Sequence, residues 1–428
     1  MDFAFGFEVH QPFRVRKDYY WKASIFRERN KVFDYFDNEL NQRIFRRIKN
    51  NCYNPTLDLL QELWEKYDFK TFVSISGTFV EQAIAWGKEV IDKISRLVSK
   101  GAIELLCQTY YHSITSLWDD LSEWRDQVKE HVDLMRETFG FSPKLFENTE
   151  LIYSRRIIDE IRRFNFSGII MEGAETLLKG KDPNFSYNYE GLKVIFRNYK
   201  LSDDIAFRFS NADWSEYPLT AEKYAKWVSS SSGDHILVFI DFETFGEHHK
   251  AESGIFSFLR ALPKKLKEEG VNFIHPSETK SPIGDIYLDE RYYSWADAKD
   301  ERSWRGNQMQ WATDEQLRKL EGLVKRIGGD YLKAWKYFTT SDHVYYMFRG
   351  FGSSQQVHSY FSHYSSPEDA FINVFSSLLD LEYRTREILG IKHSPYRLKG
   401  EGSRYLWTKE EVSGLNEEGL SEWLREEF

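Results

Sequence analysis

The chain has 428 residues, 41% of them hydrophobic, which allows a large core and more than one structural unit. Its 58 basic and 67 acidic residues give a net charge of −9, which argues against a nucleic-acid partner. No run of about 18 apolar residues occurs, so no membrane span is expected. The N-terminal residues lack the basic region of a secretory signal, and Cys52 and Cys107 are the only cysteines. We therefore expect a cytoplasmic protein without a disulfide scaffold.

Aromatic residues make up 17% of the chain, with 13 Trp, 25 Tyr and 33 Phe. Most of them, roughly 80%, should lie in the core, because large aromatic side chains gain most from burial. The remainder can form flat surfaces on which sugar rings lie. A charged fraction of 29%, with two Cys and five Met residues, points to a thermophilic source.

Strand and helix patterns alternate in the first part of the chain. Strands are predicted at Asp2–Val9, Lys70–Ser76, Ile103–Tyr111, Lys144–Glu150, Gly168–Glu172, around Ile236–Ile240 and at Val271–His275, with a further apolar stretch at Val194–Phe196. Helices are predicted at Asn54–Tyr67, Thr78–Val98 with a break at Gly87, Ser122–Phe139, Ser154–Phe164, Ala221–Ser229 and Ile255–Glu269. This alternation indicates a parallel βα architecture, and a closed or nearly closed barrel fits best.

The pattern changes after residue 280. Lys280–Asp285 is typical of a linker, and the predicted elements that follow are helices, at Thr313–Ile327, with Thr313 as its cap, at Tyr331–Phe338 and at Pro367–Leu389. Ser366 as N-cap and Pro367 at the first helical position make the last helix the strongest in the chain. We therefore expect a barrel over residues 1–280, an α-helical unit over 281–395 that packs on the barrel and contributes to its cleft, and a polar tail over 396–428 with a short helix near Leu420–Glu426.

Acidic residues follow two of the predicted strands. Ile236–Ile240 runs directly into Asp241, and Glu243 lies two residues further on, so both carboxylates face one side of an extended backbone. Glu150 ends another predicted strand. In barrel-like α/β folds the active site lies at this end of the strands. The structural alternative is a solvated acid at a strand end for Asp241 and, for Glu150, an acid stabilised by the dipole of the following helix.

Two acids on separate strand ends, Glu150 and Asp241, fit glycoside hydrolysis. That reaction needs a carboxyl group on each side of the scissile bond, about 5–5.5 Å apart in retaining enzymes and roughly 6.5–9.5 Å apart in inverting ones. The sequence contains no HExxH, no cysteine pair at zinc spacing, no phosphate-binding glycine loop and no GxSxG elbow. The adjacent His248 and His249 could bind a metal, but neighbouring residues rarely point at one ion. We expect no metal and no cofactor.

Five motifs, in order along residues 1 to about 390, resemble those of glycoside hydrolase family 57, which contains α-amylases, 4-α-glucanotransferases, branching enzymes and amylopullulanases. The motifs are His10-Gln11-Pro12, Gly101–Leu105 running on to His112, Asn148–Tyr153, Asp241–Gly246 and Ser341-Asp342. Each motif alone is weak evidence for this resemblance, but the five together are a specific signal. Two positions differ from transferase and branching members: Glu8 stands where several carry His, and Glu247-His248-His249 replaces a stretch that is often aromatic. Both departures, with the NTELIY form of the third motif, are closer to the α-amylase branch.

The resemblance implies an incomplete TIM-type barrel, (β/α)7, followed by an α-helical domain. It also implies retention through a covalent glycosyl-enzyme, with Glu150 as nucleophile and Asp241 as acid/base. Asp241 must then hold a proton in the free enzyme, so we expect its pKa to be raised by burial or by nearby Glu243 and Glu150. The residues expected to contact substrate are His10, Gln11, Glu104, His112, Glu243 and Asp342, with Trp118 and Trp214 as candidate stacking platforms.

The function expected from these observations is a retaining α-amylase that cleaves α-1,4-glucosidic bonds of starch, glycogen or maltooligosaccharides. The alternatives within the family are a 4-α-glucanotransferase or a branching enzyme, in which a sugar replaces water. A non-catalytic glycan-binding protein and a metal-dependent polysaccharide deacetylase are rivals from other classes. The sequence gives no indication of the oligomeric state.

Overall fold

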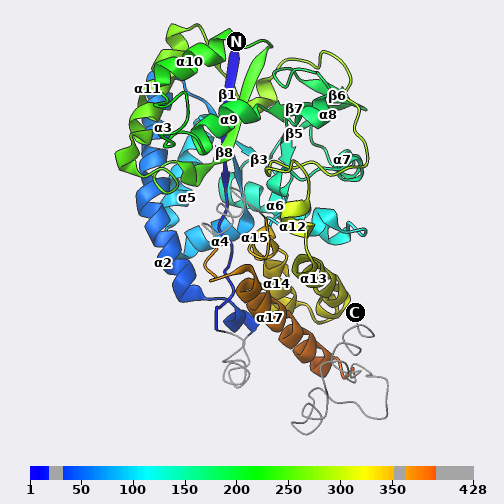
Figure 1. The fold of residues 1–428 in the computed structure, drawn as a ribbon. Helices are drawn as coiled ribbons and strands as arrows, with labels where there is room; N and C mark the ends of the chain where they lie inside the picture. Colours follow the sequence, from blue (N-terminus) through cyan, green and yellow to red (C-terminus); the bar gives the residue numbers. More distant parts are fainter. Residues whose placement is uncertain (19–31, 351–361, 392–428) are drawn as a thin grey trace.

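β1 (Asp2–Val9) lies in the middle of a parallel sheet with the strand order β3-β2-β1-β8. It pairs with β2 (Thr71–Ile75) and β8 (His235–Asp241), and β9 (Asn272–Phe273) pairs with its first residues. β3 (Ile103–Leu106) pairs with the other edge of β2. The computed structural model, drawn in Figure 1, describes residues 1–18, 32–350 and 362–391.

A second sheet completes the barrel. β4 (Leu145–Glu147), β5 (Gly168–Glu172) and β7 (Leu192–Arg197) are parallel, and β6 (Tyr187–Tyr189) adds an antiparallel edge. Cys107 joins the sheets on one side through its N–H to the Leu145 carbonyl (3.0 Å), and the Asn198 N–H bonds the Leu237 carbonyl on the other (2.8 Å). The ring β1-β2-β3-β4-β5-β7-β8 is the expected (β/α)7 barrel.

The main differences between the predicted and observed strands concern β3, β4 and β6. β4 ends at Glu147 rather than at Glu150, because Asn148 begins the 3₁₀ turn Thr149–Leu151. β3 ends at Leu106 rather than at Tyr111, because Cys107 leaves β2 to bridge β4 and the chain then turns toward the mouth of the barrel. β6 was not predicted. It is short, and it forms a hairpin with β7 through Glu190 and Gly191, both at positive φ, as a tight two-residue hairpin requires.

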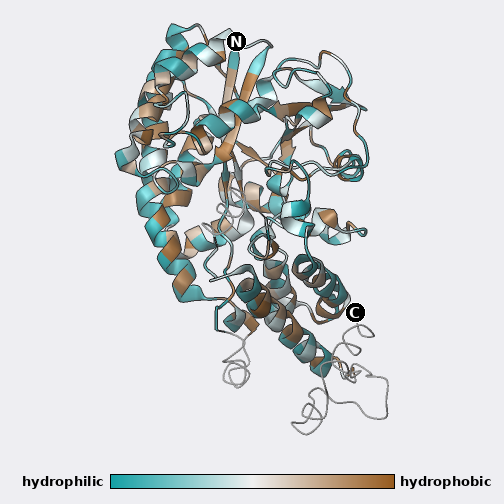
Figure 2. Cartoon of the chain, viewed as in Figure 1, coloured by the Kyte–Doolittle hydropathy of each residue, from teal (hydrophilic) through white to brown (hydrophobic). Residues whose placement is uncertain are grey.

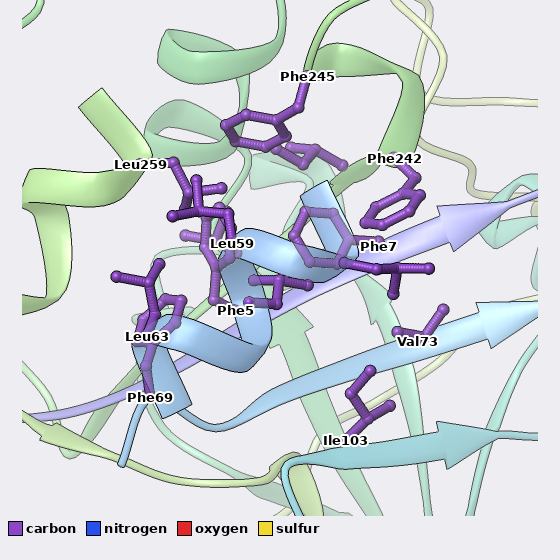
Figure 3. Close-up of a cluster of buried hydrophobic side chains, with 14 of the residues drawn as sticks. Phe5, Phe7, Leu59, Leu63, Phe69, Val73, Ile103, Phe242, Phe245 and Leu259 are labelled. Carbon is purple, nitrogen blue, oxygen red and sulfur yellow. The ribbon is translucent and has the colours of Figure 1, made fainter. Parts of the chain in front are cut away.

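The alternation of side chains in β1 explains how the barrel is filled. Phe3, Phe5 and Phe7 point outward into an apolar cluster beneath the surrounding helices, where Phe5 and Phe7 pack near Phe242 and Phe245 (Figure 3). Gly6 and Glu8 alternate with them and point inward. A Cβ on Gly6 would lie 2.2 Å from ring carbons of Phe72, so only glycine leaves room for that ring.

Helices cover the outside of the barrel, with apolar residues toward the strands and polar residues toward solvent (Figures 1 and 2). They are α2 (Asn38–Ile48), α3 (Asn54–Tyr67), α4 (Gly77–Trp86), α5 (Lys88–Ser99), α6 (Ser122–Phe139), α7 (Arg155–Ile161), α8 (Glu175–Leu178), α9 (Tyr199–Ala206), α10 (Ala221–Ser230) and α11 (Ile255–Glu268). No helix among the described residues is long and apolar enough to span a bilayer.

The described chain after the barrel begins with an irregular segment and continues with helices. Residues 280–301 form irregular structure with isolated bridges to the barrel, and α12 (Arg302–Arg305), α13 (Gln308–Ile327), α14 (Gly329–Phe338), α15 (Ser341–Tyr345) and α17 (Pro367–Ile388) follow. Ser366 caps α17 as predicted. The predicted cap Thr313 is wrong: α13 starts earlier, because Asn307 and Gln310 form a capping box. The tail 396–428 and its predicted helix lie outside the described residues.

These C-terminal helices pack on the end of the barrel at which the strands finish (Figure 1). Their apolar cluster includes Trp335, Leu317 and Leu378 and takes in Tyr111 and Ile152 from loops that follow barrel strands. The helices therefore cover the loops where a barrel active site is built.

A polar layer lies inside the barrel beneath this end. Gln108 donates from Nε2 to Glu8 (2.8 Å) and to Ser74 (2.7 Å), and the Ser74 hydroxyl donates to Glu147 (2.9 Å). Glu8 is 3% exposed and Glu147 is 1% exposed. Burial raises the pKa of Glu147 to about 8, and burial together with Glu147 raises that of Glu8 well above its usual range. The layer therefore holds protons at neutral pH.

Gly6→Ala should lower the free energy of unfolding by about 1–3 kcal/mol, because the new methyl group overlaps the Phe72 ring inside a packed barrel. Gly322→Ala in exposed α13 is the matched control. Nothing lies within 4 Å of its added Cβ, so this variant should gain roughly 0.5–1 kcal/mol. Urea denaturation measures both, and equal stability of the two variants would contradict the packing argument.

Glu147→Gln should gain stability relative to the wild type as pH rises from about 5 to 8. The folded state keeps a proton on Glu147 up to a pKa of about 8, whereas the unfolded chain releases it near 4.3, so ionisation penalises the wild type by up to about 1.4 kcal/mol per pH unit. Glutamine cannot ionise and escapes this penalty. Urea denaturation across this range measures the difference. For exposed Glu252→Gln, the free energy of unfolding should change with pH as it does in the wild type. The same pH dependence for Glu147→Gln would show that Glu147 does not hold a proton in the folded state.

Candidate active site

A cavity of about 860 Å³ opens where the barrel strands end. This volume is typical of a small-molecule site. Its walls combine residues of both parts of the chain. The residues used below are Glu8, His10, Gln11, His112, Glu150, Asp241 and Glu243 from the barrel, and Trp295, Asp342 and Tyr345 from the segment that follows it.

Glu150 reaches the cavity from a strained turn. After β4 the chain forms the 3₁₀ turn Thr149–Leu151, in which Glu150 has φ 61° and ψ 19° and Leu151 has φ 50°. Left-handed backbone is uncommon for residues other than glycine and clusters at functional sites. Asn148 fixes the turn: its Nδ2 donates to the Ile152 carbonyl (2.6 Å), and its Oδ1 accepts from Trp124 Nε1 (2.9 Å). The sequence therefore aims the Glu150 carboxylate at a defined point.

Three donors face the Glu150 carboxylate. The Ser341 hydroxyl bonds Oε1 at 2.8 Å, the indole N–H of Trp295 bonds Oε2 at 2.7 Å, and His112 Nε2 lies 3.5 Å from Oε1. Burial alone would lower the pKa of His112. The hydrogen bond with Glu150 and the carboxylates of Glu8 and Glu150 outweigh burial and raise it to about 9. A cationic imidazolium therefore stands beside Glu150 at neutral pH.

Asp241 has the opposite surroundings. It ends β8 in register with Glu8 of β1, and within the described ranges its carboxyl group has no hydrogen bond or ion pair. Burial, then Glu243 and Glu150, raise its pKa to about 8. The expected rise is thus confirmed, and Asp241 carries a proton at neutral pH.

Two side chains hold Glu243 by hydrogen bonds. The Tyr53 hydroxyl donates to its Oε1 at 2.5 Å, and Gln11 Nε2 donates to the same oxygen at 3.1 Å. Burial raises the pKa of Glu243 to about 7 against the lowering effect of these bonds. Arg14 in turn donates to the Gln11 side-chain oxygen at 3.2 Å, so Gln11 is oriented.

His10 and Asp342 form a second pair across the two parts of the chain. His10 Nε2 lies 2.9 Å from Asp342 Oδ2, its Nδ1 lies 2.7 Å from the Ser76 hydroxyl, and its ring stacks on His112 with centroids 4.3 Å apart. Burial and His112 lower the pKa of His10 to about 4, so this ring is neutral. Burial would raise the pKa of Asp342, but His10 and His112 outweigh it and keep Asp342 ionised.

Three of the predicted substrate-contacting residues do not line the cavity, and these expectations are corrected. Glu104 lies near the start of β3, at the opposite end of the strand, where its carboxylate accepts from the Ser277 N–H (3.1 Å). Trp118 is 1% exposed and belongs to the apolar cluster of the C-terminal helices, and its indole donates to Asp314. Trp214 packs beside Trp227 and under Arg208 on the outside of the barrel.

Sequence reasoning missed two residues that contact Glu150. Ser341 belongs to the motif Ser341-Asp342, in which only Asp342 was predicted to contact substrate. Trp295 lies in the irregular segment after the barrel and belongs to no motif. Its ring is fixed between Phe239 (5.7 Å between centroids) and Arg197 (5.8 Å). Only the fold brings it to the cavity.

His249 has a structural role. Its Nε2 lies 3.0 Å from the carbonyls of Ile205 and Ala206, and its Nδ1 lies 2.8 Å from the Ser210 hydroxyl. Over the described ranges, no group of three or more His, Cys, Asp and Glu side chains is arranged to hold a metal ion.

Comparison with known proteins relates this site to one family. A protein of Methanocaldococcus jannaschii named "Putative alpha-amylase" is 41% identical over 402 residues, which cover 90% of this chain and 85% of that protein. A branching enzyme of Thermococcus kodakaraensis shares the fold, with a TM-score of 0.65, 14% identity and coverage of 93% of this chain and 97% of that one.

The 4-alpha-glucanotransferase of Thermococcus litoralis also shares the fold, with a TM-score of 0.59 and 15% identity over 89% of this chain. The chain spans 58% of the length of that enzyme. Residues 4–289, which hold all of the barrel except the first two residues of β1, match the family described as Glycosyl hydrolase family 57. With the ordered motifs, the (β/α)7 barrel and two carboxyl groups in one cavity, the chain belongs to glycosyl hydrolase family 57 and is a glycan-active enzyme.

Proposed function

We propose that this enzyme is a retaining α-glucan hydrolase, an α-amylase that cleaves α-1,4-glucosidic bonds, with Glu150 as nucleophile and Asp241 as acid/base. One observation carries the proposal: two carboxyl groups in one cavity have opposite surroundings. Donors and a cationic His112 face Glu150, whereas half-buried Asp241 lies near the acids Glu243 and Glu150 and holds a proton. Such a pair divides the roles of base and acid at neutral pH.

The reaction has two steps. In the first, the Glu150 carboxylate forms a C–O bond to the anomeric carbon, the glycosidic bond breaks, and Asp241 gives its proton to the leaving oxygen. In the second, water attacks the same carbon, its proton goes to Asp241, and the bond to Glu150 breaks. Ser341 and Trp295 hold the two oxygens of the nucleophile so that one lone pair points at the substrate.

The sugar at the reaction centre would be held by the polar side chains around these acids. Asp342 accepts hydrogen bonds in its ionised form, and neutral His10 beside it fixes its orientation. His112, Gln11 and Glu243 complete this polar surround. The high identity to the Methanocaldococcus jannaschii protein supports α-amylase as the specific activity.

The second candidate is a 4-α-glucanotransferase or a branching enzyme, which solved relatives of the same fold favour. In these enzymes a sugar hydroxyl resolves the intermediate. Products from maltoheptaose separate the candidates: net gain of reducing ends supports hydrolysis, and oligosaccharides longer than the substrate support transfer. A glycan-binding protein without activity would yield no product, and a metal-dependent deacetylase would lose activity in chelator.

Glu150→Gln should lower kcat on maltoheptaose by roughly four to six orders of magnitude, because an amide cannot form the covalent intermediate. Oligosaccharide binding should persist, since glutamine keeps an oxygen for Ser341. Glu104→Gln is the matched control, because that residue lies at the far end of β3, and it should stay near the wild type. Reducing-end assays and calorimetric titration measure both, and near wild-type turnover by Glu150→Gln would remove the assignment.

The kcat/KM for maltoheptaose should fall as pH rises through about 8, because Asp241 loses the proton that the leaving oxygen requires. Asp241→Asn should lower this kcat/KM by about 10²–10⁴. The loss should be much smaller on α-maltosyl fluoride, because fluoride leaves without protonation. Fluoride-electrode and reducing-end assays compare the substrates. Equal losses on both would show that Asp241 does not protonate the leaving group.

A further inference from the structure

One wall of the cavity lies beside the end of β8, which carries Asp241. Three segments build it: the end of α9, the loop that follows β8, and α2. We call this wall the α9 lobe; the cavity-lining residues that define it are Asp203, Ala206, Phe207, Arg208, Glu247, His248, Lys250, Ile44, Arg47 and Ile48.

The α9 lobe is held together by side chains that the reaction does not use. His249 joins the β8 loop to α9 by bonding the carbonyls of Ile205 and Ala206, directly before Phe207. Arg47 of α2 pairs with Glu247 of the loop at 2.7 Å. Gly246 at φ +100° brings the loop so close to the π-helical turn Lys49–Tyr53, which follows α2, that an added Cβ would lie 2.0 Å from the Asn51 carbonyl. The wall is therefore preformed.

Phe207 is the unusual side chain of this wall. It is 57% exposed, and of the large hydrophobic residues exposed on the described surface it alone borders the cavity. Arg47, Arg208 and Lys250 line the same cavity, and each pairs with a carboxylate. Their charged groups carry further N–H donors. An exposed aromatic ring among donors suits a pyranose, whose apolar face lies on the ring while its hydroxyl groups bond to the rim.

We propose that the α9 lobe binds the sugar on the leaving-group side of the scissile bond, with Phe207 as its stacking platform. The assignment rests on the proposed function, because the group that Asp241 protonates must lie on the Asp241 side of the cavity. The glycosyl part attached to Glu150 then lies toward Trp295 and Tyr345. Phe207 thereby takes the platform role that Trp118 and Trp214 do not fill.

The same lobe decides what resolves the intermediate. After the leaving sugar departs, either water or a second sugar occupies the space beside Asp241. A sugar bound on Phe207 directs a hydroxyl group to the anomeric carbon; its proton goes to Asp241, a new glycosidic bond forms, and the bond to Glu150 breaks. Phe207 therefore sets the balance between transfer and hydrolysis.

The test compares two substrates that share the glycosyl part and differ in the leaving group. Phe207→Ala should lower kcat/KM for maltoheptaose about tenfold and the yield of transfer products formed with added maltose by a similar factor. Fluoride release from α-maltosyl fluoride without acceptor should stay within about twofold of the wild type, because no leaving sugar needs the platform. Phe207→Tyr, which keeps a ring, should restore maltoheptaose cleavage.

Two further variants exclude structural explanations. Phe207→Leu keeps apolar bulk without a ring. Its melting temperature should be unchanged, and its losses in kcat/KM for maltoheptaose and in transfer yield should match those of Phe207→Ala. Tyr287→Ala removes an aromatic side chain that is 67% exposed outside the cavity and should behave as the wild type. Equal losses on both substrates, or wild-type transfer by Phe207→Leu, would overturn the inference. A wild type that forms no product from either substrate would overturn the proposed function instead.

Discussion

Removing a carboxyl group from water costs free energy, and the mouth of this barrel removes several at once. Glu8, Glu147 and Glu243 are buried and Asp241 is half-buried, and loss of solvent raises the pKa values of all four. These acids reduce the penalty by holding protons. Asp342 is the exception, because His10 and His112 beside it keep it ionised. Glu150 differs from the other acids in its contacts, since three donors face its carboxyl group.

Neither part of the chain builds the site alone. Ser341 and Trp295 reach Glu150 from beyond the barrel, and Asp342 closes on His10 across 332 positions of sequence. The Ser341 N–H also bonds the His112 carbonyl at 2.9 Å, which fixes α15 to the loop after β3. Because groups on α15 and the irregular segment orient Glu150, any shift of these elements against the barrel changes where its carboxyl group points.

The sequence predicted what depends on local pattern. The strand Asp2–Val9 is recognisable from its loose alternation, Gly168–Glu172 from its apolar residues, and the cap of α17 from Ser366 and Pro367. The acids Glu150 and Asp241 were recognisable by their place after strands. Spacing could not reveal tertiary packing. Trp118 resembled a sugar platform until its indole was found bonded to Asp314, and Phe207, one aromatic residue among many, gave no signal until the fold left it exposed in a wall.

The aromatic rings inside the barrel limit how a polymer can approach. Phe72 fills the space that Gly6 leaves and stacks on Phe239, with centroids 5.7 Å apart and planes at 15°, and Trp295 lies against the other side of Phe239. This column fills the lumen of the barrel beside Glu150, to which Trp295 donates. No polymer can pass through the barrel, so one that enters the cavity must lie across the mouth, with both of its ends on the open side.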